Sequence, residues 1–245
     1  MLPLRDQIAE AVAVRSRRRS GTPFLAYLQP GTNTHAETTA LRAVFDEVVG
    51  HPAVAGLIVG TRPDCLPEAT LDLLAEVAGR TWLLIEVGLQ SMDDRSLAWL
   101  GRGHGYAAFV DAVARCRRRR LRLGVHLILG LPGETVDGSR TTAAEVSRLE
   151  VFSVKLHHLH AVRGTPLAAM VAGGTVRLPT ADEYMEHVLA FLEHLRPECV
   201  VDRLVGEARR PYLVAPLWSE QKSAILAKID AEMARRDTWQ GKCRG

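Results

Sequence analysis

Apolar runs alternate with amphipathic segments about every 30 residues, and this rhythm constrains the fold more than any other feature of the sequence. The apolar runs at residues 54–61, 82–90 and 122–129 are each followed by a stretch with helical spacing. Parallel strands need such a crossover segment between them, which is usually a helix. The sequence therefore predicts an α/β fold built on a parallel sheet.

Six segments are predicted as strands, at residues 24–29, 54–61, 82–90, 122–129, 152–160 and 199–204. Helices are predicted at residues 4–19, 37–49, 67–78, 93–100, 106–120, 141–149, 180–195 and 218–236. The helix at 180–195 has a capping-box pattern, with Thr180 at its start and Glu183 three residues on. Six strands fall short of the eight in a closed barrel, so we expect a partial, open βα barrel.

The order of the elements also gives an expected domain organisation. The chain begins on a helix, so a first strand of the barrel is expected to be missing. We expect residues 1–208 to form the partial barrel. Residues 209–245 are expected to add a C-terminal helical extension packed on the same domain.

Composition favours a soluble cytoplasmic protein. No apolar run is long enough to span a membrane, and the N-terminus lacks the layout of a signal peptide. Arginines cluster between Arg15 and Arg19 and between Arg115 and Arg122. Such runs are typical of a nucleic-acid surface or of solvated helix ends. The lack of interleaved aromatic residues for base stacking favours the second interpretation.

Polar side chains gather near the carboxyl ends of five predicted strands. They are Gln29, Arg62, Glu86, Gln90, His126, Lys155 and His157. Each could be a satisfied core group, but barrel-like α/β folds carry their active sites at this end. A carboxylate such as Glu86 is costly to bury without a partner or a ligand. The shared location therefore predicts a ligand pocket.

Two further motifs leave alternatives open. The segment 130–134 (GLPGE) directly follows a strand, where Gly130 and Gly133 permit close approach of a ligand but also suit an ordinary turn. In the segment 155–160 (KLHHLH), His158 and His160 share a face and could bind a metal, although no carboxylate or cysteine lies near them on that element. We assign no metal ligands from the sequence.

Several enzyme classes are excluded by missing motifs. The sequence contains no GxSxG elbow, no P-loop and no HExxH helix. The glycine-rich segment 101–105 follows a predicted helix rather than a strand, which excludes the Rossmann arrangement.

A series of short segments resembles the YhcC/YtqA group of radical S-adenosylmethionine (SAM) proteins, which is similar to the elongator catalytic subunit. In chain order they are FLAYLQPGTNT (24–34), GTRPDC (60–65), EVGLQS (86–91), RGH (102–104), HLILGLPGET (126–135), KLHHLH (155–160), RGTP (163–166) and RRPYLVAPLW (209–218). Individually these strings are modest, but together, in order and at the expected spacing, they are specific.

The resemblance implies a partial barrel that binds SAM and a [4Fe–4S] cluster. Members of the family cleave SAM reductively to a 5′-deoxyadenosyl radical, with a reductant such as flavodoxin or ferredoxin. The resemblance also implies a role in tRNA modification. The predicted cofactor-binding residues are Gln29, Thr32, Asn33, Thr34, Arg62, Glu86, Gln90, Gly130 and Gly133, and the predicted catalytic residues are His126, Lys155 and His157.

Within this set, residues 29–34 correspond to the family segment that meets the methionyl part of SAM. Glu86 and Gln90 correspond to the strand that meets the ribose, and residues 126–133 to the strand that flanks the adenine. Residues 29–34 read QPGTNT here instead of the common Gly-Gly-Glu, so the group that holds the SAM amino group is not assigned.

The main departure from the family concerns its CxxxCxxC cluster motif, which follows the first strand. The cysteines of this chain, Cys65, Cys116, Cys199 and Cys243, share no short spacing. Three hypotheses follow: a radical SAM enzyme whose motif lies upstream of this sequence, a truncated SAM- or RNA-binding module without catalysis, or an unrelated barrel enzyme. The third would use Glu86, His126 and Lys155 as acid–base groups.

The missing motif generates a first testable expectation. After anaerobic reconstitution with iron and sulfide, the 245-residue chain should bind no [4Fe–4S] cluster, because no three thiolates are placed to hold one. Visible absorption should then lack the broad charge-transfer bands of a cluster. A stoichiometric cluster on this chain would contradict the expectation.

Overall fold

The computed structural model describes residues 3–16, 23–208 and 211–244. Its helices are α1 (Leu4–Ser16), α2 (Thr38–Val49), α3 (Glu68–Ala78), α4 (Asp94–Trp99), α5 (Tyr106–Arg118), α6 (Val136–Arg148), α7 (Pro166–Ala172), α8 (Ala181–His194) and α9 (Lys222–Arg235), with 3₁₀ turns η1 (Pro63–Cys65) and η2 (Leu217–Gln221). Its strands are β1 (Phe24–Leu28), β2 (Val54–Thr61), β3 (Trp82–Gln90), β4 (Arg122–Leu129), β5 (Ser153–His158), β6 (Ala161–Val162), β7 (Val200–Arg203) and β8 (Leu213–Ala215).

The main sheet has six strands in the order β1-β2-β3-β4-β5-β7. Strand β2 pairs in parallel with both β1 and β3, and β5 pairs in parallel with β7. This is the parallel half-barrel that the strand–helix rhythm predicts. Strand β1 forms one edge of the sheet.

The chain divides into two compact units, which we describe separately. The first unit comprises Met1–Gly88 and Ala107–Gly124, and the second comprises Leu89–Tyr106 and Val125–Gly245. The expected boundary after residue 208 adjoins residues outside the described ranges and stays a prediction. Across the described residues, we find no helix with the length and apolar character needed to cross a bilayer.

The first unit packs α2, α3 and α5 onto its strands through apolar side chains at helical spacing. Phe45 of α2, Leu74 of α3 and Phe109 of α5 are fully buried. Burial of each such side chain contributes about 1.5–3 kcal/mol. Helix α1 packs beside α2, where the backbone N–H of Arg5 donates to Oε1 of Glu47 at 2.9 Å.

The second arginine run serves this unit internally. Arg115 donates to the carbonyl of Leu66, and Arg119 pairs with Glu68 and Asp72. The guanidinium of Arg122 lies over the ring of Trp82, 5.8 Å from its centroid. These contacts agree with the interpretation of this run as helix-end residues. Residues 17–19 of the first run lie outside the described ranges, as do the side chains at 15 and 16.

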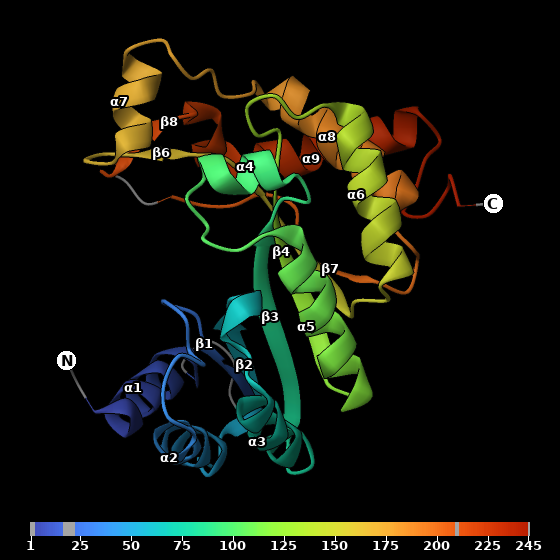
Figure 1. The fold of residues 1–245 in the computed structure, drawn as a ribbon. Coiled ribbons are helices and arrows are strands. Elements are labelled where there is room, and N and C mark those ends of the chain that lie inside the picture. The colour runs from blue at the N-terminus through green and yellow to red at the C-terminus, as the bar shows by residue number, and fades with distance from the viewer. Residues whose placement is uncertain (1–2, 17–22, 209–210, 245) are drawn as a thin grey trace. The chain divides into compact units, whose positions relative to one another are not determined.

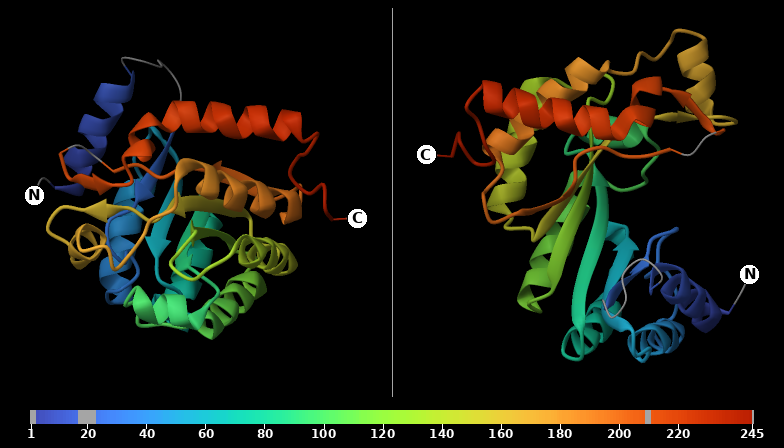
Figure 2. Two further views of the ribbon diagram at one scale, coloured as in Figure 1. Left: turned by 90° about the horizontal axis from the view of Figure 1, so that it is seen from above. Right: turned by 180° about the vertical axis from the view of Figure 1, so that it is seen from behind.

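In the second unit, α8 packs against α6 and α9 runs along α8 (Figure 2). The predicted capping box at the start of α8 is confirmed: Thr180 Oγ1 accepts from the N–H of Glu183, whose carboxylate accepts from the N–H of Thr180. The short antiparallel pair β6–β8 packs against α7 (Figure 1). These three elements are not predicted from the sequence.

Some element boundaries differ from the predictions. Helix α6 begins at Val136 rather than at 141, because Thr135 Oγ1 caps it by accepting from Gly138 N at 3.1 Å. Helix α7 begins on Pro166, and Thr165 Oγ1 caps it by accepting from Ala168 N at 3.3 Å. Strand β5 ends at His158 instead of residue 160. The predicted helix at 218–236 is in fact the turn η2 followed by α9.

An unpaired histidine forms part of the core of the second unit. His158 is 1% exposed, and neither of its ring nitrogens has a hydrogen-bond partner among the described residues. Its ring centroid lies 5.6 Å from that of Tyr184 and 4.6 Å from that of Trp218. Burial is the main cause that lowers the pKa of His158, to about 4. The imidazole is therefore a neutral core ring at pH 7, and the alternative of a metal ligand gains no support from its surroundings.

We predict that acid weakens this core. The unfolded chain protonates a histidine near pH 6.5, whereas folded His158 resists protonation down to about pH 4, so stability falls as the pH drops through this window. As the pH falls from 7 to 5, His158 should lower the free energy of unfolding by about 2 kcal/mol. His158→Phe keeps an aromatic ring and removes the titrating group. Between pH 7 and 5, the unfolding free energy of this variant should therefore fall by about 2 kcal/mol less than that of the wild-type chain. Denaturant unfolding at both pH values measures it.

The exposed His35 provides the matched control, because His35→Gln removes a histidine that lies outside the core. Other histidines with lowered pKa values, His157, His160 and His187, should leave a residual acid sensitivity in His158→Phe. Equal losses in the wild-type chain and in His158→Phe would refute the prediction.

Candidate functional site

A buried carboxylate lies on the sheet of the first unit. Glu86 of β3 is 2% exposed, and the hydroxyl of Tyr27 on β1 donates to its Oε2. In the strand register Glu86 stands beside Gly60 of β2, a position without a side chain. A Cβ at position 60 would lie 3.1 Å from the carbonyl oxygen of Leu28. The absence of a side chain at Gly60 therefore allows β1 to lie close to β2.

The loop after β1 is fastened to the end of β2 by two predicted cofactor-binding residues. The Asn33 amide donates to the carbonyls of Leu28 and Gly60, at 2.7 and 3.0 Å. Thr34 Oγ1 donates to the carbonyl of Cys65 and lies 2.5 Å from Thr61 Oγ1. Asn33 and Thr34 thus shape the loop rather than present free side chains.

The rest of this loop stays accessible. Gln29 is exposed and Thr32 is half-buried. Gly31 has φ 77°, a conformation that favours glycine, and no atom lies within 4 Å of the place where its Cβ would be. A ligand could approach the backbone here. The roles predicted for Gln29 and Thr32 remain predictions.

Arg62 is engaged by a neighbour two residues away. Its Nε and Nη2 donate to the two carboxylate oxygens of Asp64, at 2.9 and 2.7 Å, and this pair raises the pKa of Arg62. A cofactor contact by Arg62 would compete with this bidentate pair. Cys65 Sγ lies 4.0 Å from Nδ1 of His35, and burial raises the pKa of Cys65, so the sulfur is a thiol at pH 7.

In the second unit, two loops that follow strands are tied together. Ser91 Oγ, just after β3, donates to Oε1 of Glu134, after β4, at 2.5 Å, and accepts from Asp93 N at 3.0 Å. Burial raises the pKa of Glu134. Gln90 at the end of β3 has φ 75°. A non-glycine residue in this region is strained, and such strain clusters at functional sites.

The two predicted glycines after β4 differ in their surroundings. Both have positive φ, 72° for Gly130 and 85° for Gly133. A Cβ on Gly130 would lie 3.1 Å from Pro179 Cγ, so this glycine is needed for packing as well as for the turn. Around Gly133 no atom would meet a Cβ within 4 Å. Of the two, Gly133 offers the open backbone that a ligand can approach.

The predicted catalytic residues lie on β4 and β5 of the second unit, together with an arginine that the sequence reasoning missed. The rings of His126 and His157 have centroids 6.4 Å apart. Arg203 of β7 donates to Nε2 of His157 and pairs with Lys155 in the strand register. Burial, followed by the charge of Arg203, lowers the pKa of His157 to about 3. Arg203 could have been found by the rule used for the other strands, because it closes the last strand of the sheet.

This geometry bears on the catalytic role predicted for His157, which stays a prediction. With a pKa of about 3 it is neutral at pH 7 and accepts a hydrogen bond from Arg203, so it is poorly matched to proton transfer at neutral pH. Gly206 lies against the same ring, since a Cβ at that position would overlap Nδ1 of His157. The His157 ring is therefore held in place from two sides and can orient Arg203.

The cysteines do not form a ligand set for a [4Fe–4S] cluster. Cys116 and Cys199 are buried, and burial raises their pKa values to about 11 and about 12. Within the ranges that the structure describes, no three cysteine sulfurs come together. The four cysteines, as placed among the described residues, therefore do not fit this cofactor.

Comparisons with known proteins place these features in a family. The radical SAM superfamily profile matches residues 4–145, and the Radical_SAM C-terminal domain profile matches residues 151–235. The chain is 36% identical to the uncharacterized protein YtqA of Bacillus subtilis over 89% of its length and 68% of YtqA. The expected resemblance to the YhcC/YtqA group is thereby confirmed.

Two archaeal proteins extend the comparison. A tRNA uridine(34) acetyltransferase of Methanocaldococcus infernus is 25% identical over 64% of this chain and 29% of its own length. The structure of Elp3 from the same organism, with an N-terminal deletion, superposes with a TM-score of 0.76 at 17% identity, covering 96% of this chain and 59% of that one. The second likeness concerns the fold alone. On the profile and the YtqA match, this chain belongs to the radical SAM superfamily.

Proposed function

We propose that the first unit binds SAM at the carboxyl ends of its strands, and that the chain is the SAM-binding part of a radical SAM enzyme. The observation that carries the proposal is the buried carboxylate of Glu86, which Tyr27 orients and which stands beside Gly60, a position without a side chain. A carboxylate in this setting is an acceptor suited to the hydroxyls of a ribose. The exposed glycine backbone at Gly31 gives a second place for a ligand to approach.

In radical SAM enzymes the bound cofactor supplies the oxidising power for hydrogen abstraction from a substrate. The residues of this chain contribute binding and orientation: Tyr27 fixes the Glu86 carboxylate, and Asn33 and Thr34 fix the loop that follows β1. The contributions of Gln90, Gly130 and Gly133 remain predictions. Without cluster ligands among these residues, a SAM- or RNA-binding module without catalysis is the second candidate.

We further propose that the substrate is an RNA, of the tRNA class. The name of the archaeal relative supports this substrate class. In the second unit, Lys155 and Arg203 stand side by side on adjacent strands, and His157 accepts a hydrogen bond from Arg203. Two neighbouring cations, one of them oriented, suit a phosphate group.

Glu86 provides the direct test of SAM binding. Glu86→Ala should weaken SAM binding by about 1–3 kcal/mol, because a buried hydrogen-bond acceptor is lost. Tyr27→Phe removes only the hydroxyl that orients the carboxylate and should have a smaller effect in the same direction. Isothermal titration calorimetry on the folded variants measures both.

Arg80→Ala serves as the control for this test. It removes an exposed ion pair with Asp46 at the opposite end of β3 and should leave SAM affinity unchanged. Two results would overturn the proposal: no SAM binding by the wild-type chain, or unaltered affinity in a folded Glu86→Ala variant.

Lys155 provides the test of RNA binding. Lys155→Ala should weaken tRNA binding similarly for different tRNAs and lower the slope of log K against log salt by about 1, as expected for one lost phosphate contact. Lys228→Ala removes the same charge from α9, where Lys228 pairs with Asp182, and should not change the slope. Filter binding at several salt concentrations decides it. Equal slopes for all three proteins would exclude Lys155 from the RNA contact.

A further inference from the structure

The C-terminal tail of the second unit returns to the end of α8. The N–H groups of Gly241 and Cys243 donate to the carbonyls of Leu192 and Glu193, each at 2.9 Å. These carbonyls belong to the last turn of the helix, where intrahelical partners run out. Thr238 Oγ1 donates to Oε1 of Glu193 at 2.8 Å. The tail is thus held to the helix by several directional bonds.

This arrangement gathers three different metal-ligand groups. A carboxylate oxygen of Glu193, a ring nitrogen of His194 and the sulfur of Cys243 all lie within 4.8 Å of one another. In a tetrahedral zinc site with bonds of 2.0–2.3 Å, neighbouring ligand atoms are roughly 3.5 Å apart. Small side-chain rotations would therefore bring the three atoms onto one ion.

Hydrogen bonds orient two of these side chains, His194 and Glu193, for metal binding. Nδ1 of His194 lies 3.0 Å from the carbonyl oxygen of Ala190, one turn earlier in α8. A carbonyl only accepts, so Nδ1 carries the proton and Nε2 keeps its lone pair. Metal-bound histidines characteristically donate their second ring N–H to such a group. Thr238 fixes one oxygen of Glu193 in the same way.

The ligand types select among cations. A thiolate and an imidazole favour zinc-like ions over magnesium or calcium, which prefer oxygen ligands. Arg244 donates weakly, at 3.4 Å, to the carbonyl of His194, and its positive charge opposes a cation nearby. The carboxylate and the thiolate together balance the two charges of Zn²⁺, so the occupied site would be neutral apart from this arginine.

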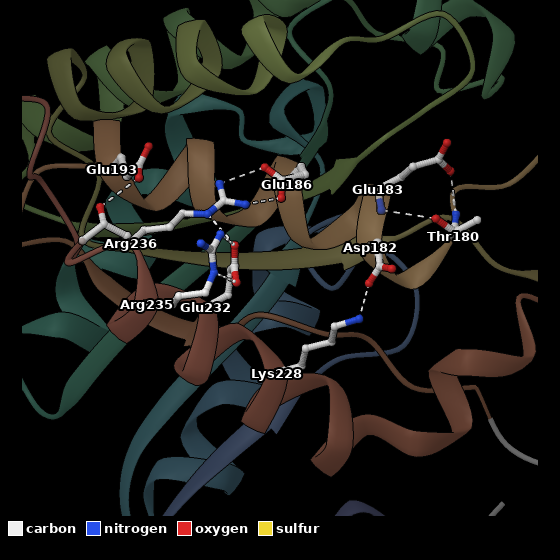
Figure 3. A network of polar contacts seen from close by, with 10 residues as sticks. Thr180, Asp182, Glu183, Glu186, Glu193, Lys228, Glu232, Arg235 and Arg236 are labelled. Carbon is white, nitrogen blue, oxygen red and sulfur yellow. Dashed lines mark hydrogen bonds and ion pairs between the residues drawn. The ribbon is translucent and has the colours of Figure 1, made fainter.

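We propose that Glu193, His194 and Cys243 form a Zn²⁺ site, with water as the fourth ligand, that clamps the C-terminal tail to the end of α8. In Figure 3, Glu193 lies at one end of the polar network between α8 and α9, and Asp182 lies near the other end, paired with Lys228. The ion would add a bond from the tail itself, beyond α9. This site is independent of SAM binding by the first unit.

Cobalt substitution tests the proposal on the full chain, without a histidine tag and kept reduced. Co²⁺ added to metal-free protein should give one equivalent of a near-ultraviolet thiolate-to-cobalt band, and Zn²⁺ should displace it. Cys243→Ser should abolish the band, and His194→Gln and Glu193→Gln should each weaken binding at least about 10-fold. Cys65→Ser, which removes the other cysteine that is not buried, should behave as the wild-type chain.

Alkylation gives a second readout that does not use the cobalt spectrum. Zn²⁺ should slow iodoacetamide modification of Cys243 at least about 10-fold and leave Cys65 unaffected, as followed by peptide mass spectrometry. Circular dichroism confirms that each variant is folded. The proposal is overturned if the wild-type chain shows no thiolate band, if Cys243→Ser keeps it, or if Zn²⁺ does not protect Cys243.

Discussion

The candidate SAM site depends on the register of β2 against its two neighbours. Tyr27 pairs with Ile58, and Gly60 pairs with Glu86, so the Tyr27 hydroxyl can reach across β2 to the carboxylate. A shift of one residue in β1 would turn Tyr27 to the other face of the sheet. Glu86 would then lose this donor inside the core, where buried polar groups need hydrogen-bond partners. The contact between Tyr27 and Glu86 therefore needs both the register of the strands and the glycine at position 60.

Burial decides what the histidines and cysteines of this chain can do. His157 and His158 are consecutive on β5 and point to opposite faces, one toward Arg203 and the other toward Tyr184 and Trp218. Both stay neutral at pH 7 because burial opposes their charge. The same effect keeps the Cys116 and Cys199 sulfurs protonated and unreactive.

The sequence predicted those elements whose signals are local. The bounds of β2, β3 and β4 match the predicted strands, because each is an apolar run that ends at polar or glycine residues. The presence of six strands in the main sheet and the capping box of α8 followed from similar local patterns. Strands β6 and β8 escaped prediction because a pair of such short strands depends on a partner some fifty residues away rather than on its own pattern.

The site was predictable only in part, for the same reason. The sequence placed Glu86 among the polar groups near the strand ends, but it could not show that Asp64 would engage Arg62 or that Asn33 would be used within its own loop. Such competition between neighbours depends on side-chain reach after folding. Arg203 was overlooked although it obeys the same end-of-strand rule, because the polar residues of the last strand were not sorted by face.

The attachment of α9 to α8 combines two kinds of contact with opposite responses to the surroundings. Ile225 and Ile229 of α9 are buried, whereas ion pairs such as Lys228–Asp182 and Arg236–Glu186 are partly exposed (Figure 3). Apolar burial weakens on cooling, and exposed ion pairs are screened by salt. The attachment of α9 to α8 should therefore be strongest at moderate temperature and low ionic strength. It should be weakest at low temperature and high salt concentration.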